Sequence, residues 1–183
     1  MKRIAPVLVA VAVAALLIVY APPISVQGGE SASTILASPI LVSPIFGLTI
    51  PAGYRDWKLI SVGRIGGSTN DLRAKLGNDV AIKAYREGTL PFPDGAIIAR
   101  LAWHEVTSEE NDMALGDVRS FVTGGATNLE FMVKDSKKYA ATGGWGFAQF
   151  TGGKPDSEAL HKTCFPCHAP AKASDYIFTR YAP

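Results

Sequence analysis

The sequence predicts a mainly β protein of the α+β class, with an antiparallel sheet and two or three short helices. Two stretches, residues 96–106 and 127–134, alternate in the way that a strand with two different faces requires. A turn rich in proline and glycine, Pro91-Phe92-Pro93-Asp94-Gly95, leads directly into the first of them. Short strands that are separated by such turns are typical of an antiparallel sheet.

Before these stretches, the pattern predicts two strands and a helix. We expect strands at Trp57–Val62 and Asp71–Leu76. A short helix is predicted over Val80–Arg86, because the Asn78-Asp79 pair offers a capping side chain before it and Gly88 can end it.

The two alternating strands each combine an apolar face with a mixed one. The mixed faces hold the polar side chains Arg100, His104, Asn128 and Glu130 among apolar neighbours. The apolar faces carry Ile97, Ala99, Leu101 and Trp103 on the first strand, and Leu129, Phe131 and Val133 on the second.

The remaining segments are short. Residues 107–117 are polar and are expected to form a loop, and residues 135–139 one helical turn. The segment Trp145–Phe150 reopens the chain after two glycines, and Pro155–Thr163 is predicted to be a short helix that leads into the motif described below.

The N-terminus predicts a secretory leader. A basic start, Met1-Lys2-Arg3, precedes an apolar run over residues 4–19, slightly shorter than the roughly 20 residues of a membrane span. We therefore expect a signal peptide over residues 1–29, with an uncleaved membrane anchor as the alternative. Residues 30–50 are expected to form a linker and an extended arm, and residues 51–183 a single domain.

The charge balance excludes one class of partner. The chain has a formal net charge of +2 and 19% charged residues, so it lacks the basic field that nucleic-acid binding needs.

The motif that carries chemistry is Cys164-Phe165-Pro166-Cys167-His168, and it contains both cysteines of the 183-residue chain. A Cys-x-x-Cys-His run is typical of covalent haem c attachment. Each of the two thiols can add to one vinyl group of the porphyrin, and the histidine that follows can ligate the iron. The motif thus predicts one haem c, held by Cys164 and Cys167, with His168 as its metal ligand.

Two other interpretations of the motif stay open. A redox-active disulfide would not explain the presence of His168 in the motif, and the βαβ context that usually surrounds such a cysteine pair is missing. With His161, the run offers four zinc ligands. They would all come from eight consecutive residues, however, so the metal would join no second segment of the chain.

Several short segments, in this order and spacing, resemble one known family. They are Tyr54-Arg55-Asp56-Trp57, Phe92-Pro93-Asp94-Gly95, Val133-Lys134-Asp135-Ser136, Gly144-Trp145-Gly146-Phe147, the haem motif, Ala171-Lys172-Ala173-Ser174-Asp175 and Phe178-Thr179-Arg180. The chain resembles the cytochrome P-460 family, which includes haem c enzymes that oxidise hydroxylamine and the related cytochromes c prime beta. The resemblance implies a mostly antiparallel sheet, a haem with an open distal face and, in many members, a homodimer.

The resemblance also implies two residues of the distal pocket. The family's cross-linking lysine, which is bonded to the porphyrin edge, matches Arg100, and a guanidinium is a poor substitute for a free amine. Lys83 and Lys134 flank that region. The family's proton-transferring carboxylate matches Glu130, and an ion pair with Arg100 would keep it ionised. His104 is expected at the rim or surface, and Met132 in the core.

Two functions follow from this resemblance. The first is an exported, periplasmic or membrane-tethered oxidoreductase that oxidises hydroxylamine or nitric oxide and passes electrons to an external acceptor. The second is a non-catalytic cytochrome that binds gases or carries electrons, which the arginine at position 100 favours.

Overall fold

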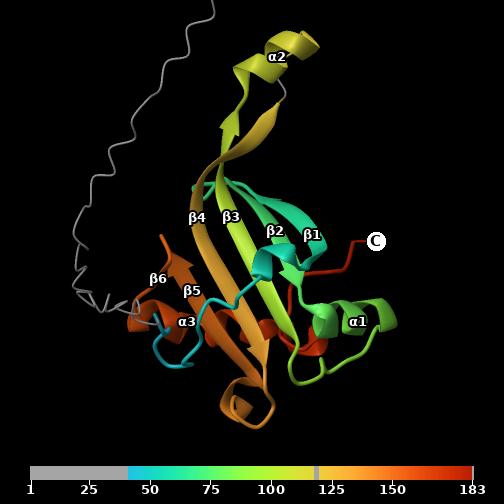
Figure 1. Cartoon of the computed structure of the whole chain (residues 1–183), viewed down its shortest axis with the longest axis vertical. Coiled ribbons are helices and arrows are strands. Elements are labelled where there is room, and N and C mark those ends of the chain that lie inside the picture. Colours follow the sequence, from blue (N-terminus) through green and yellow to red (C-terminus); the bar gives the residue numbers. More distant parts are fainter. Residues whose placement is uncertain (1–40, 118–119, 183) are drawn as a thin grey trace, which may run out of the picture. The chain divides into compact units, whose positions relative to one another are not determined.

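In the part of the chain that the structure describes, six antiparallel strands form one sheet in which neighbours in the sequence are also neighbours in space (Figure 1). The computed structural model describes residues 41–117 and 120–182. The predicted leader, residues 1–29, and residues 30–40 of the predicted linker lie outside these residues. The strands are β1 (Lys58–Ile65), β2 (Asp71–Gly77), β3 (Ile97–Thr107), β4 (Phe121–Lys134), β5 (Trp145–Thr151) and β6 (Lys154–Pro155).

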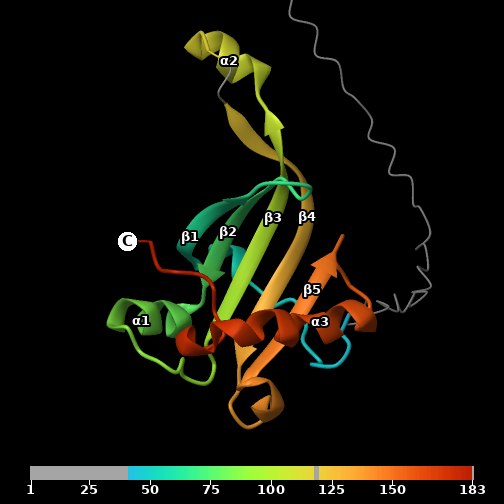
Figure 2. The ribbon, with the colours of Figure 1, turned by 180° about the vertical axis from the view of Figure 1, so that it is seen from behind.

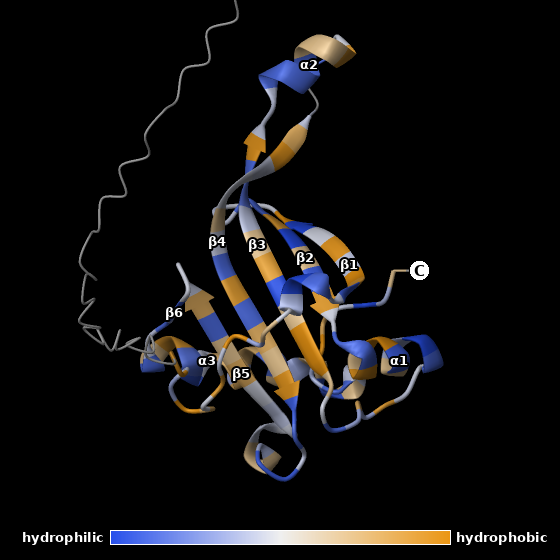
Figure 3. Cartoon of the chain, in the orientation of Figure 1, coloured by the Kyte–Doolittle hydropathy of each residue, from blue (hydrophilic) through white to orange (hydrophobic). Residues whose placement is uncertain are grey.

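The predicted fold class is confirmed, and so are the two faces of the central strands. Ile98 and Arg100 of β3 pair with Met132 and Glu130 of β4, so the mixed faces of the two strands form one surface. Figure 3 shows the alternation of hydropathy along these strands. The period of two in the sequence therefore identified which side chains share a surface.

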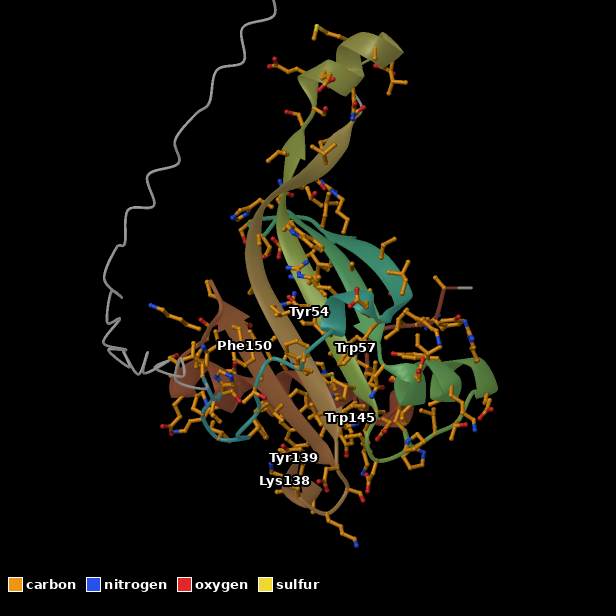
Figure 4. All side chains as sticks on the ribbon, viewed as in Figure 1. Tyr54, Trp57, Lys138, Tyr139, Trp145 and Phe150 are labelled. Carbon is orange, nitrogen blue, oxygen red and sulfur yellow. The ribbon has the colours of Figure 1, made fainter. Side chains whose placement is uncertain are left out.

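Two regions of the chain lie on opposite faces of the sheet. Residues 41–57, which include the short 3-10 helix η1 (Tyr54–Asp56), cross the face seen in Figure 1. Tyr54 and Trp57 lie over this face (Figure 4), and the Tyr54 ring meets the Phe131 ring edge-on at 5.4 Å. The helices α3 (Glu158–His168) and η3 (Ala169–Ser174) cross the other face, seen in Figure 2.

The described part of the predicted arm packs onto the domain. Phe46 and Leu48 are buried, and the Tyr139 hydroxyl donates to the Phe46 carbonyl oxygen at 3.1 Å. The prolines prevent regular secondary structure here, and buried apolar side chains attach the segment to the domain instead.

Helix α1 (Asp79–Glu87) has the predicted cap and stop residues and extends one residue beyond the predicted Val80–Arg86 at each end. The Asn78 side chain accepts a hydrogen bond from the Ala81 amide at 3.0 Å, and Gly88 ends the helix with φ of 65°. The Asn78 side chain also accepts from the Ile97 amide at 3.0 Å, which ties the helix to the start of β3.

Several predicted bounds were wrong. The expected loop at 107–117 contains helix α2 (Glu109–Leu115), which Ser108 caps and Gly116 ends. The strand predicted from residue 127 begins at Phe121, because residues 121–126 pair with the far end of β3. The first strand runs to Ile65 instead of Val62, and a 3-10 turn, η2 (Ala140–Thr142), follows the turn at 135–139. Within the described residues, no helix is long and apolar enough to cross a membrane.

Candidate cofactor site

Helix α3 places the motif residues on one helical face. It was predicted to end at Thr163, but it continues to His168 with Pro166 inside it. Positions i, i+3, i+4, i+7 and i+8 of a helix share a face. The residues at these positions, Leu160, Thr163, Cys164, Cys167 and His168, all line the same cavity.

A side-chain cap starts this helix, and the His161 ring ties it to the sheet. The Ser157 side chain caps its first turn by accepting from the Leu160 amide at 3.3 Å. The His161 ring is 1% exposed; its Nδ1 lies 2.9 Å from the Ser157 carbonyl oxygen, and its Nε2 accepts from the Gln149 amide of β5 at 3.1 Å. Both ring nitrogens of His161 are therefore engaged in structural hydrogen bonds, which argues against the zinc interpretation.

The two thiols of the motif are free and differ in their surroundings. Cys167 is exposed, whereas Cys164 is partly buried. Burial raises the pKa of the Cys164 thiol to about 11, with smaller contributions from the negative charge of Glu130 and from Cys167. Cys164 is thus a neutral thiol at physiological pH.

His168 is oriented by a backbone carbonyl. Its Nδ1 donates a hydrogen bond to the Tyr176 carbonyl oxygen at 2.7 Å. A carbonyl oxygen can only accept, so Nδ1 carries the proton and Nε2 keeps its lone pair. An imidazole with this arrangement is prepared to ligate a metal through Nε2. The rings of Phe147 and Phe178 flank it at 5.0 and 5.2 Å.

The cavity has a volume of about 800 Å³, within the roughly 300–1,000 Å³ typical of cofactor sites. α3 and residues 177–180 form one wall, and strands β1 to β5 form the other. Its lining includes apolar side chains that are unusually exposed, with Val62 72% and Phe178 61% exposed. A large apolar group between the walls would cover them. The residues present therefore fit a porphyrin held from the α3 side.

On the sheet wall, Arg100 and Glu130 face the same cavity. They are direct Cα partners in the β3–β4 ladder, and the Arg100 guanidinium donates to the Glu130 carboxylate. It also donates to the Asn128 side-chain oxygen at 2.7 Å. Burial lowers the pKa of Arg100, and the negative charge of Glu130 opposes this shift.

Lys75 is a cavity residue that the sequence argument missed. It lies on β2 directly opposite Arg100, and a Cβ at Gly63 of β1 would stand 2.8 Å from its Nζ. Among the described residues, no hydrogen bond or ion pair engages its amine. Burial lowers the pKa of Lys75, and the positive charges of Arg73 and Arg100 add to this. The alternation Asp71-Leu72-Arg73-Ala74-Lys75 was the signal, because it places three charged side chains on one face of a strand.

Of the other candidates, only Met132 lines the cavity. His104 is exposed and does not line the cavity, whereas Met132 is buried and does line it. Of the two flanking lysines, Lys83 is exposed on α1 and Lys134 is buried in an ion pair with Asp175.

Two thiols and an oriented imidazole lie on one wall of the cavity, and the sheet forms the other wall. This arrangement is typical of haem-binding proteins. The chain matches the model of the family described as Cytochrome P460 over residues 51–179. It belongs to that family and is a haem protein. No curated protein matches the chain.

Proposed function

We propose that the chain carries one haem c, attached covalently through Cys164 and Cys167, with His168 as the proximal iron ligand. The observation that carries this proposal is the single helical face on which the two thiols and the imidazole line one cavity. When bound, the haem supplies a redox-active iron that accepts small ligands on its free side.

We propose further that the protein oxidises small nitrogen compounds, hydroxylamine or nitric oxide. The polar groups of the sheet wall, Arg100, Asn128 and Glu130, lie among apolar side chains. Such a cavity suits a small polar molecule better than a bulky substrate. Glu130 would accept protons from the substrate, while Arg100 and Asn128 hold it in position; an external acceptor would take the electrons.

A second candidate function is a cytochrome that binds gases or carries electrons without turnover. The contact between Arg100 and Glu130 favours it, because the guanidinium already occupies the carboxylate that would have to accept protons from a substrate. In this case nitric oxide would bind reversibly without net oxidation.

Export belongs to the same proposal. The predicted leader would deliver the chain to the periplasm or tether it to the membrane, and haem c is attached outside the cytoplasmic membrane in bacteria. A small nitrogen compound, an external electron acceptor and a second copy of the chain are the partners that we propose.

The deciding experiment uses the exported, purified protein. Intact mass and a haem stain after denaturation test the covalent attachment, and peptide mapping that includes Arg100 and Lys75 tests for a further link to the porphyrin. Reduction of an external acceptor upon addition of hydroxylamine supports the oxidoreductase. Reversible nitric oxide binding with no turnover above that of free haem supports the second function instead. A protein that loses all haem on denaturation contradicts the attachment.

A further inference from the structure

The carbonyl that orients His168 belongs to an unusual backbone segment. Asp175 and Tyr176 both have left-handed backbone conformations, with φ of 52° and 64°. Side-chain-bearing residues adopt this conformation rarely, and two in a row require support from their surroundings. This bend directs the Tyr176 carbonyl oxygen to Nδ1 of His168 at 2.7 Å.

A buried ion pair provides part of this support. Both carboxylate oxygens of Asp175 lie 2.9 Å from Nζ of Lys134, and the two residues are 8% and 5% exposed. The Asp175 carboxylate also accepts from the Phe92 amide at 2.8 Å, and Lys134 donates to the Gly143 carbonyl oxygen at 3.1 Å. Four separate segments of the chain therefore meet at this pair.

The Tyr176 ring is confined as well. A Cβ at Gly143 would stand 2.1 Å from it, and the Phe165 ring lies 5.4 Å away on α3. The Tyr176 amide donates to the Ala171 carbonyl oxygen at 2.9 Å. Because the ring, the amide and the preceding residue are all held, the carbonyl has little freedom to leave the imidazole.

We propose that Lys134 and Asp175 are positioning residues for the proximal ligand: their ion pair fixes the Tyr176 carbonyl against His168 and thereby sets how strongly the imidazole donates to iron. This rests on the proposed ligation of haem by His168. A hydrogen bond from Nδ1 raises the basicity of a ligating imidazole. A buried ion pair often adds little stability compared with apolar side chains of similar size. A role in positioning the Tyr176 carbonyl therefore accounts for the pair better than stability does.

The test uses the haem-loaded protein and two variants, Asp175→Asn and the double change Lys134→Met with Asp175→Asn. The double variant leaves no uncompensated buried charge and is the one more certain to fold. With the carbonyl less firmly held, the imidazole becomes a weaker donor. We expect the reduction potential of the haem to rise and the iron–histidine stretching frequency of the ferrous protein to fall in both variants.

Two controls separate this role from a loss of stability. Ile82 is buried in α1 and does not line the cofactor cavity, so Ile82→Val lowers stability by leaving a small void elsewhere. Lys58→Met breaks the exposed ion pair with Asp79. Both should keep the wild-type potential and stretching frequency.

Wild-type values in both pair variants, or an equal shift in Ile82→Val, would overturn the proposal. Failure of the proposed function gives a different result, since a wild-type protein without covalently bound haem would be seen before any variant is measured.

Discussion

The Arg100 guanidinium and the Glu130 carboxylate lie directly opposite each other on neighbouring strands and are joined by a hydrogen bond within the cavity wall. Their side chains are 15% and 34% exposed, so the pair is partly shielded from water. Partial shielding strengthens the attraction between the two charges relative to an exposed pair. The sheet wall, which faces α3 across the cavity, therefore carries a charged pair at this place.

This relationship gives a first prediction. If Glu130 accepts protons during hydroxylamine oxidation, Glu130→Gln should lower kcat by about 100-fold, because a positioned general base typically contributes this much. The affinity for nitric oxide should change little, since that ligand needs no proton acceptor. The matched control is Glu105→Gln, which breaks the Arg64–Glu105 pair outside the cavity. Unchanged turnover in Glu130→Gln would remove the carboxylate from the mechanism.

A second prediction concerns the attachment of α3 to the sheet. His161→Phe keeps a ring of similar size but leaves the Gln149 amide without its acceptor. An unsatisfied buried donor costs about 1–3 kcal/mol, so the free energy of unfolding should fall by about that amount.

Urea unfolding measures this loss. His104→Gln, at an exposed position, serves as the control and should stay within about 0.5 kcal/mol of wild type. Equal stability of wild type and His161→Phe would show that this hydrogen bond does not anchor the helix.

A third prediction tests the fit of Tyr176 against Gly143. Gly143→Ala places a Cβ 2.1 Å from the tyrosine ring at a residue with φ of 67°. Gly152→Ala introduces a similar backbone strain, at φ of 58°, but meets no atom within 4 Å. The control should cost about 1 kcal/mol. Gly143→Ala should cost about 1–3 kcal/mol more, because the ring must move. Equal losses of thermal stability in the two variants would contradict this packing.

A fourth prediction concerns pH and Lys75. The folded-state pKa of Lys75 lies below 10.5, its ordinary value, so the unfolded chain binds more protons between the two values. Between these two pKa values the free energy of unfolding of the wild type rises with pH. At lower pH the charged, partly buried amine lowers the free energy of unfolding. Lys75→Met should therefore be more stable than the wild type at pH 7, by less than about 1 kcal/mol because the side chain is partly solvated.

The advantage of Lys75→Met should shrink as the pH approaches 10.5. Urea unfolding of the haem-free protein at pH 7 and pH 10 measures it, with Lys83→Met on the exposed side of α1 as the control. A Lys75→Met variant that is less stable than the wild type at pH 7, or a difference that does not depend on pH, would contradict the cause assigned to the shift.

The sequence allowed the local features to be predicted. The shared surface of Arg100 and Glu130 followed from the period of two along each strand, and α1 followed from Asn78 and Gly88. The motif at residues 164–168 could be recognised from the sequence because its thiols and imidazole lie close together in the chain. The family prediction was confirmed by the match over residues 51–179.

Other features depended on contacts that a local pattern does not contain. Residues 121–126 include Gly124 and Gly125, which have low β propensity, and they form a strand because β3 is available as a partner. Helix α2 lacks an apolar periodicity, although Ser108 and Gly116 marked its ends. The alternation at residues 71–75 indicated a charged strand face, but only the pairing of Lys75 with Arg100 places that face on the cavity.

The two walls of the cavity come from separate parts of the chain. One continuous helical segment carries the thiols and the histidine, whereas β2, β3 and β4 carry Lys75, Arg100 and Glu130. A single substitution on a strand can therefore change the lining of the cavity without altering the segment that carries Cys164, Cys167 and His168. The polar groups of the sheet wall can thus be varied one strand position at a time, while the thiols and the imidazole of α3 stay the same.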